Sequence, residues 1–253
     1  FILFVAPRIF WIVVCAVCAG LAAHEWARLT KMSKMTHAAF VLCLVLLVAA
    51  CSLPRVSPVF ANAMFLLSAV FWTTLVPYWL WRRELPVVSG FSVVAGFLVI
   101  GSAVIGIITL RDIGSWLVIC ILGVIWISDS MAYFVGSAFG RHKLAPAISP
   151  GKTWEGVAGA MVFVIFYASI LGFFSPGVFP SGFVHEPGGW LALTGLMLAL
   201  AVLGIYGDLF ESFLKRLAGV KDSGTLLPGH GGLLDRIDAL LPVLPVAALF
   251  FSN

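Results

Sequence analysis

The chain has 253 residues, of which 62% are hydrophobic and 10% are charged, and its formal net charge is +4. Soluble globular proteins carry about 25% charged residues, so this composition excludes a globule surrounded by water. The apolar runs are also longer than the alternating segments of about ten residues in an outer-membrane barrel. The sequence therefore predicts an all-α fold, a polytopic integral membrane bundle of about eight or nine transmembrane helices.

Apolar runs follow one another along the whole chain, and most approach the roughly 20 residues that cross a bilayer core. The chain begins at Phe1 rather than Met, and residues 1–6 are typical of the end of a helix, so we interpret the N-terminus as truncated. The spans predicted after it are, in chain order, 9–28, 37–53, 58–81, 86–110, 113–140, 156–175, 189–213 and 237–251.

Lysine and arginine residues divide unequally between the two sides that these spans define. Twelve of the 15 fall on one side, and the other side receives only Arg8, Arg55 and Arg111. The positive-inside rule makes the richer side cytoplasmic. The two basic loops, 141–155 and 214–236, then share the cytoplasmic face. The 176–188 loop contains no Lys or Arg and is expected outside as a passive connector.

Two aspartates stand where charged residues are costly. Asp129 interrupts the otherwise uncharged stretch 113–140, and Asp208 follows the uncharged run 187–207. A carboxylate at membrane depth costs at least a few kcal/mol, so it usually faces a polar cavity and has a function there. The alternative is that either aspartate lies at the level of the lipid headgroups.

A polar stripe begins at Asp208 and leads into a charged loop. Asp208, Glu211, Ser212 and Lys215 fall on one face of a helix, and acids and cations are then interleaved as far as Asp238. Mg²⁺ prefers carboxylate and phosphate oxygens, and Lys and Arg neutralise the remaining phosphate charge. The pattern therefore predicts a metal–phosphate site, and the alternative is a solvated loop with positive-inside charge.

The other basic loop contains Gly151-Lys152-Thr153, which suggests a phosphate-binding P-loop. That motif requires a glycine five residues before Gly151, where this chain has Pro146. We expect instead a Pro-Gly turn and a helix that opens near Thr153, whose N–H groups, together with Lys152, could hold a phosphate. The alternative is an ordinary capped helix start.

These two loops carry a resemblance to a known family. A signature of 27 residues has every fixed position filled, namely Ser212, Lys215, Arg216, Lys221, Asp222, Gly224, Leu227, Pro228, His230, Gly231, Gly232, Leu233, Asp235, Arg236, Ile237 and Asp238. Gly207-Asp208, Ser128-Asp129-Ser130 and the 143–156 stretch match as well. Over about residues 120–240 the sequence resembles the phosphatidate cytidylyltransferase family. The first hundred residues resemble it only in hydropathy and in a His-Glu-Trp at 24–26.

The resemblance implies an integral membrane enzyme that joins CTP and phosphatidate to give CDP-diacylglycerol and pyrophosphate, with one or two Mg²⁺ ions. It also implies a homodimer, and we expect no nucleic acid among the binding partners. The metal ligands that it implies are Asp208 and Asp235, with Asp238 as a further candidate. We expect transmembrane helices over 1–110 and the catalytic region over 111–253. We place the protein in a bacterial inner membrane, with the active site facing the cytoplasm.

The remaining site residues follow from the charge of the substrates. A phosphate monoester is already anionic at pH 7, because its second pKa is about 6, so no general base is required. Positioning and charge neutralisation carry most of the catalysis in phosphoryl transfer. We assign catalytic roles to Lys215 and Arg216 beside the two aspartates. The expected substrate-binding residues are Ser212, Lys221, His230 and Arg236, and, on the nucleotide side, Asp129, Lys143 and Lys152.

Two other functions compete with this interpretation. Buried acids in a hydrophobic bundle are also typical of ion-coupled secondary transporters. Such a transporter would spread its charges near the midplane, whereas these charges gather in two loops on one side. A related CTP-dependent enzyme acting on a polyprenol-type lipid is the second alternative, because the signature does not name the acyl chains.

Overall fold

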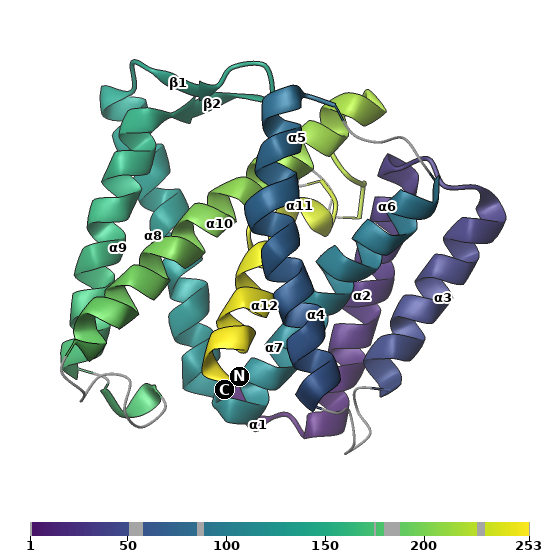
Figure 1. Cartoon of the computed structure of the whole chain (residues 1–253), viewed down its shortest axis with the longest axis horizontal. Coiled ribbons are helices and arrows are strands. Elements are labelled where there is room, and N and C mark those ends of the chain that lie inside the picture. Colours follow the sequence, from purple (N-terminus) through teal and green to yellow (C-terminus); the bar gives the residue numbers. More distant parts are fainter. Residues whose placement is uncertain are drawn as a thin grey trace.

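The computed structural model (Figure 1) describes residues 2–50, 58–84, 89–174, 176–179, 188–226 and 231–252. Within these residues, six helices are long and apolar enough to cross a membrane. Two shorter apolar helices, α3 (Lys34–Ala50) and α12 (Leu240–Phe251), correspond to the other predicted spans. The predicted fold class, a helical membrane bundle, is confirmed.

The N-terminal half follows the predicted spans closely. A short helix matches the expected remnant at 1–6, and the two spans at 58–81 and 86–110 each contain one π-helical turn. The elements are α1 (Ile2–Val5), α2 (Arg8–Leu29), α4 (Pro58–Val70), η1 (Phe71–Leu75), α5 (Val76–Arg82), α6 (Ser89–Gly96), η2 (Phe97–Gly101) and α7 (Ser102–Ile113). The expected positions of Arg55 and of residues 51–53 lie outside the described residues.

The C-terminal half contains the longest helix of the described chain. Its elements are α8 (Ser115–Phe139), β1 (Lys143–Ala145), β2 (Ser149–Thr153), α9 (Trp154–Phe174), η3 (Pro176–Val178), α10 (Gly189–Ala218) and α11 (Leu234–Ile237). Helix α10 runs obliquely across the bundle (Figure 1) and extends beyond the predicted end at 213. It ends at Gly219, whose φ of 77° is a left-handed conformation that glycine adopts without strain.

A small β-hairpin occupies the loop where the sequence predicts only a turn before a helix. Strands β1 and β2 are antiparallel, with Lys143 opposite Thr153 and Ala145 opposite Ser149. The helix then opens at Trp154, one residue after the predicted start. We attribute the hairpin to Pro146 and Pro150, because proline is unfavourable inside a helix and is tolerated in turns and short edge strands.

Helix α10 is held in place by aromatic rings from several elements. The ring of Phe210 lies within 6.3 Å, centroid to centroid, of four other rings, those of Trp26, Phe71, Trp72 and Trp79. Such pairs stabilise a fold beyond the area that they bury. Gly207 on the same helix faces the backbone of Asp238 and the ring of Pro242, so α10 and α12 approach closely. Small residues permit this in membrane bundles.

One end of the bundle gathers the hairpin and the end of α10, and the marked chain termini lie at the opposite end (Figure 1). We call the first of these the hairpin end. Because the chain crosses the bundle in alternating directions, the described parts of the two basic loops, 141–155 and 214–236, share this end. The arrangement agrees with the side assignment made from the Lys and Arg residues.

Candidate active site

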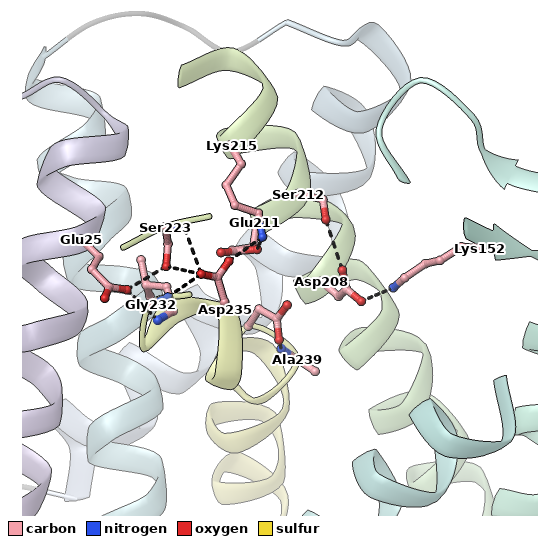
Figure 2. Close-up of polar contacts among 12 residues, drawn as sticks. Glu25, Lys152, Asp208, Glu211, Ser212, Lys215, Ser223, Gly232, Asp235 and Ala239 are labelled. Carbon is pink, nitrogen blue, oxygen red and sulfur yellow. Dashed lines mark hydrogen bonds and ion pairs between the residues drawn. The ribbon is translucent and has the colours of Figure 1, made fainter. Parts of the chain in front are cut away.

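Helix α10 presents the predicted polar face near the hairpin end, and Figure 2 shows that its side chains divide between two clusters. The side chains lie at i, i+3, i+4 and i+7, a spacing that places them on one side of the helix. The Asp235 cluster consists of Glu211, Lys215, Ser223 and Asp235. The Asp208 cluster consists of Lys152, Asp208, Ser212 and Asp238.

The Asp235 cluster is centred on the ammonium group of Lys215. Its Nζ atom lies 2.5 Å from Oε2 of Glu211 and 2.6 Å from Oδ1 of Asp235. Both carboxylates are buried, with side-chain exposures of 4% and 8%. A buried charge is costly unless it is paired. The pairing therefore fixes Lys215 between an acid of its own helix and an acid from the signature loop.

The second oxygen of Asp235 is held by donors from the loop itself. Oδ2 accepts hydrogen bonds from the backbone N–H of Ser223 at 2.9 Å, the hydroxyl of Ser223 at 2.9 Å and the N–H of Gly232 at 2.7 Å. Burial alone would raise the pKa of Asp235. The Lys215 ammonium and the N–H groups outweigh it and hold that pKa well below its usual value. Asp235 is therefore ionised at any physiological pH.

Glu25 on α2 also belongs to this site, and the sequence analysis did not select it. Its carboxylate accepts hydrogen bonds from the backbone N–H groups of Leu233 and Leu234 at 2.9 and 2.8 Å. It also lies 2.8 Å from the hydroxyl of Ser223, whose single proton is donated either to Glu25 or to Asp235. Figure 2 shows it approaching from the side of Asp235 away from Asp208. The available signal was the His-Glu-Trp at 24–26, an acid close to the end of an apolar run.

The Asp208 cluster joins the hairpin to α10. Nζ of Lys152, in strand β2, lies 2.6 Å from Oδ2 of Asp208, and the hydroxyl of Ser212 donates to its Oδ1 at 3.3 Å. Asp208 keeps 34% of its side chain exposed, far more than Asp235. The sequence prediction that Lys152 and Asp208 serve one site agrees with this contact, although their roles stay predictions.

Asp238 follows the other members of both clusters in sequence, and it belongs to the Asp208 cluster because it lies close enough for the charge of Asp208 to act on it. Burial, and then the nearby charge of Asp208, raise the pKa of Asp238 above its ordinary value, although Lys152 opposes the shift. The carboxylate of Asp129 on α8 acts in the same direction as Asp208. Three acids thus share one lysine, and a further cation would relieve their repulsion.

This acidic arrangement fits a Mg²⁺ ion. Mg²⁺ is commonly bound by one or two carboxylates together with substrate phosphates and water. Asp208 and Asp238 fit this description, because Asp208 is partly exposed and the two acids repel each other with Lys152 as the cation near both. Within the described ranges no group of three or more His, Cys, Asp or Glu side chains forms a ready-made metal cage. Asp235 remains a predicted ligand whose oxygens are occupied by donors from the chain.

The other predicted site residues lie at the same end, on the surface around the clusters. Lys143 is exposed on β1, Arg216 follows Lys215 at the end of α10, and Lys221 and Arg236 are exposed in and beside the signature loop. His230 lies outside the described residues. These four cations are exposed, and none of them is a member of either cluster.

The hairpin is fixed to helix α9 by local hydrogen bonds. The Glu155 carboxylate accepts the backbone N–H groups of Arg141 and His142, and it pairs with Nδ1 of His142 at 2.6 Å. The hydroxyl of Thr153 accepts the N–H of Gly156 at 3.2 Å. This is the capped helix start that the sequence analysis gives as the alternative. These hydrogen bonds fix the hairpin to α9, and the hairpin carries Lys152 into the site.

A helical membrane bundle with acids and cations clustered at one end is typical of a membrane-bound enzyme that handles phosphate groups. Comparison with known proteins shows which family of enzymes this is. The model of the cytidylyltransferase family matches residues 1–253. The chain belongs to this family, so the resemblance in its two loops is confirmed.

Curated relatives agree with the family. The chain is 37% identical over 252 residues to a phosphatidate cytidylyltransferase of Pseudomonas aeruginosa, an alignment that covers 92% of this chain and 84% of the relative. It is 44% identical over 138 residues to that of Haemophilus influenzae, covering 54% and 46%. It is 48% identical over 122 residues to that of Bacillus subtilis, covering 48% and 42%.

Proposed function

We propose that this protein transfers the cytidylyl group of CTP to phosphatidate at the two clusters on α10. The products are CDP-diacylglycerol and pyrophosphate. Family membership and the relatives named phosphatidate cytidylyltransferase support the reaction. The observation that carries the location is the ion pair of Lys152 with Asp208, which joins two separate segments that carry the family resemblance, at the hairpin end. The transporter alternative finds no support in these comparisons.

The chemistry requires two polyanions to meet. An oxygen of the phosphatidate monoester attacks the α-phosphorus of CTP, and pyrophosphate leaves. The attacking group is already anionic near neutral pH, so the enzyme need not remove a proton from it. The task is to neutralise and align charge, and cations and metal-binding carboxylates suit it.

The residues divide this task between them. Asp208 and Asp238 would hold Mg²⁺, which when bound supplies positive charge and polarises a phosphate oxygen. Lys152 enters from the hairpin and Lys215 from α10, each already oriented by a carboxylate. The exposed cations Arg216, Lys221 and Arg236 are proposed to contact the phosphatidate headgroup and the departing pyrophosphate. Asp129, Lys143 and Lys152 are proposed for the nucleotide side.

The membrane setting completes the proposal. Long apolar helices lead directly to the charged end, so the acyl chains can remain in lipid while the headgroup reaches the clusters. We place the hairpin end in the cytoplasm of a bacterial cell, where CTP is available, and the Lys and Arg distribution supports this orientation. We also propose a homodimer, which rests on the family resemblance alone.

The test is turnover by the purified protein with radiolabelled CTP and Mg²⁺, offering phosphatidate and polyprenyl phosphate as separate acceptors. We expect labelled CDP-diacylglycerol from phosphatidate and little product from the polyprenyl lipid. Asp208→Asn should nearly abolish turnover while the protein still inserts, because a lost Mg²⁺ ligand forfeits several kcal/mol of transition-state stabilisation.

Asp112→Asn is the matched control, since it neutralises an aspartate that pairs with Arg8 at 3.0 Å, away from both clusters. This control should keep its activity. Preferential use of the polyprenyl acceptor would favour the second enzyme class. Normal turnover by Asp208→Asn would remove the Asp208 cluster from the reaction.

A further inference from the structure

Glu25 is a buried acid in the N-terminal half of the chain, yet among the described residues its hydrogen bonds go to the signature loop. Only 4% of the residue is exposed. Its three bonds reach across 198 to 209 residues of sequence, to Ser223, Leu233 and Leu234. A buried carboxylate requires such donors, and the donors gain a fixed partner in return. Helix α2 and the loop are therefore joined at this one side chain.

Two signature glycines surround the same carboxylate. A Cβ atom added to Gly224 would lie 2.6 Å from Oε1 of Glu25, and one added to Gly232 would lie within 2.5 Å of the same oxygen. Real Cβ atoms do not approach other atoms so closely. A larger residue at Gly224 would have to displace the Glu25 carboxylate, and one at Gly232 would have to displace both that carboxylate and the hydroxyl of Ser223. Close packing against Glu25 thus explains why glycine occupies these two positions, without reference to a bound phosphate.

Ser223 connects Glu25 to Asp235. Its hydroxyl lies 2.8 Å from Oε2 of Glu25 and 2.9 Å from Oδ2 of Asp235. Asp235 in turn pairs with Lys215 at 2.6 Å. Figure 2 shows this sequence of contacts running from α2 to α10. The position of Lys215 is therefore set partly by a residue that is far from the reacting groups.

We propose that Glu25 is a positioning residue, which holds the signature loop so that Asp235 and Lys215 keep their working geometry. This inference rests on the proposed function, because it assumes that the Asp235 cluster serves the cytidylyl transfer. Glu25 itself is hydrogen-bonded to the loop and is buried. Its removal should therefore affect the rate per folded molecule more than the amount of folded protein.

The first test compares Glu25→Gln with Asp112→Asn in the purified full chain. The amide keeps the size of the side chain but turns one acceptor into a donor that faces N–H groups. We expect kcat per folded molecule to fall by about 10- to 100-fold, the usual effect of removing an outer partner of a site residue. The folded fraction is read from gel filtration in detergent. Asp112→Asn should keep the wild-type kcat.

A wild-type kcat per folded molecule in Glu25→Gln would overturn the proposal. An equal loss in Asp112→Asn would overturn it too, since that residue pairs with Arg8 and belongs to neither cluster. If Glu25→Gln does not fold, Ser223→Ala takes its place, because it removes only the shared hydroxyl. The same fall in kcat is expected there, and full activity would contradict the inference.

The glycine contacts provide an independent test. Gly224→Ala alone should lower kcat, because it pushes the Glu25 carboxylate away from the loop. In a Glu25→Ala background the same change should cost little more, so the two losses should not add. Additive losses would show that the glycine and the acid act separately, which the proposal forbids.

The outcomes separate this inference from the proposed function. If Asp208→Asn and Asp235→Asn both keep normal turnover, the site assignment fails whatever Glu25 does. If Asp235→Asn loses activity and Glu25→Gln does not, the site stands and only the positioning role is wrong.

Discussion

At the scale of single residues, Arg216 and its neighbour Lys215 are expected to have different roles. Lys215 is fixed between two carboxylates, whereas Arg216 is exposed at the end of α10. A guanidinium donates two parallel hydrogen bonds to a phosphate, and an ammonium acts as a point charge. We therefore expect Arg216 to recognise a phosphate group by its shape as well as its charge.

The prediction is that Arg216→Ala lowers kcat/KM for at least one substrate and that Arg216→Lys restores only part of the loss. The Mg²⁺ concentration for half-maximal rate should change little in either variant, because the carboxylates remain. Steady-state kinetics in detergent with titrated Mg²⁺ measures both quantities. Arg141→Lys, an exposed arginine at the same end, serves as the control. Full activity of Arg216→Lys would mean that the residue only supports topology.

Single residues were predictable where a local pattern marked them. Asp208 stands out because an acid at the end of a long uncharged run is costly, and Lys152 stands out because it follows a Pro-Gly turn. Their mutual contact could be expected only through the family resemblance. Glu25 could not be placed, since its partners lie about 200 residues away and no spacing rule connects them.

At the scale of elements, the contact of α10 with α12 decides how Asp208 lies relative to Asp238. Gly207 allows this contact, because a Cβ atom there would overlap the backbone oxygen of Asp238 and would lie 2.9 Å from the Pro242 ring. Both obstacles are rigid, so the helices would have to separate. Gly195 on the same helix has open space around its Cβ position. The two glycines form a matched pair.

We predict that Gly207→Ala lowers both stability and activity, and that Gly195→Ala does neither. Overpacking of this kind costs about 1–3 kcal/mol, whereas an alanine in open space on a helix is favourable. Thermal unfolding in detergent, followed by tryptophan fluorescence, gives the stability, and CTP turnover gives the activity. Equal melting temperatures for the two variants would show that the α10–α12 contact is looser than the structure describes.

Elements were predictable to the extent that hydropathy determines them. Apolar runs near 20 residues gave the spans, because a bilayer leaves a helix few alternatives. The hairpin was missed, since its strands have only three and five residues and no alternating pattern. The π-helical turns at 71–75 and 97–101 have no composition signal that distinguishes them from the surrounding α-helix.

At the scale of the whole molecule, the two basic loops share one end because the helices cross in alternation. Twelve of the 15 Lys and Arg residues were assigned to this side from the sequence. Figure 1 places the hairpin and the end of α10 there, opposite the marked termini. What the bundle alone does not fix is which end faces the cytoplasm, and the positive-inside rule supplies that choice.

The corresponding prediction concerns sidedness. In a background in which the five native cysteines are replaced by alanine, His142→Cys and Leu226→Cys introduce exposed thiols at the hairpin end. Gly177→Cys introduces an exposed thiol in η3, which lies toward the opposite end. A membrane-impermeant thiol reagent should label the first two only from the cytoplasmic side and the third only from outside. Labelling of all three from one side would contradict the number of crossings between the hairpin and η3. Labelling with the sides exchanged would leave the bundle intact but move the active site out of reach of cytoplasmic CTP.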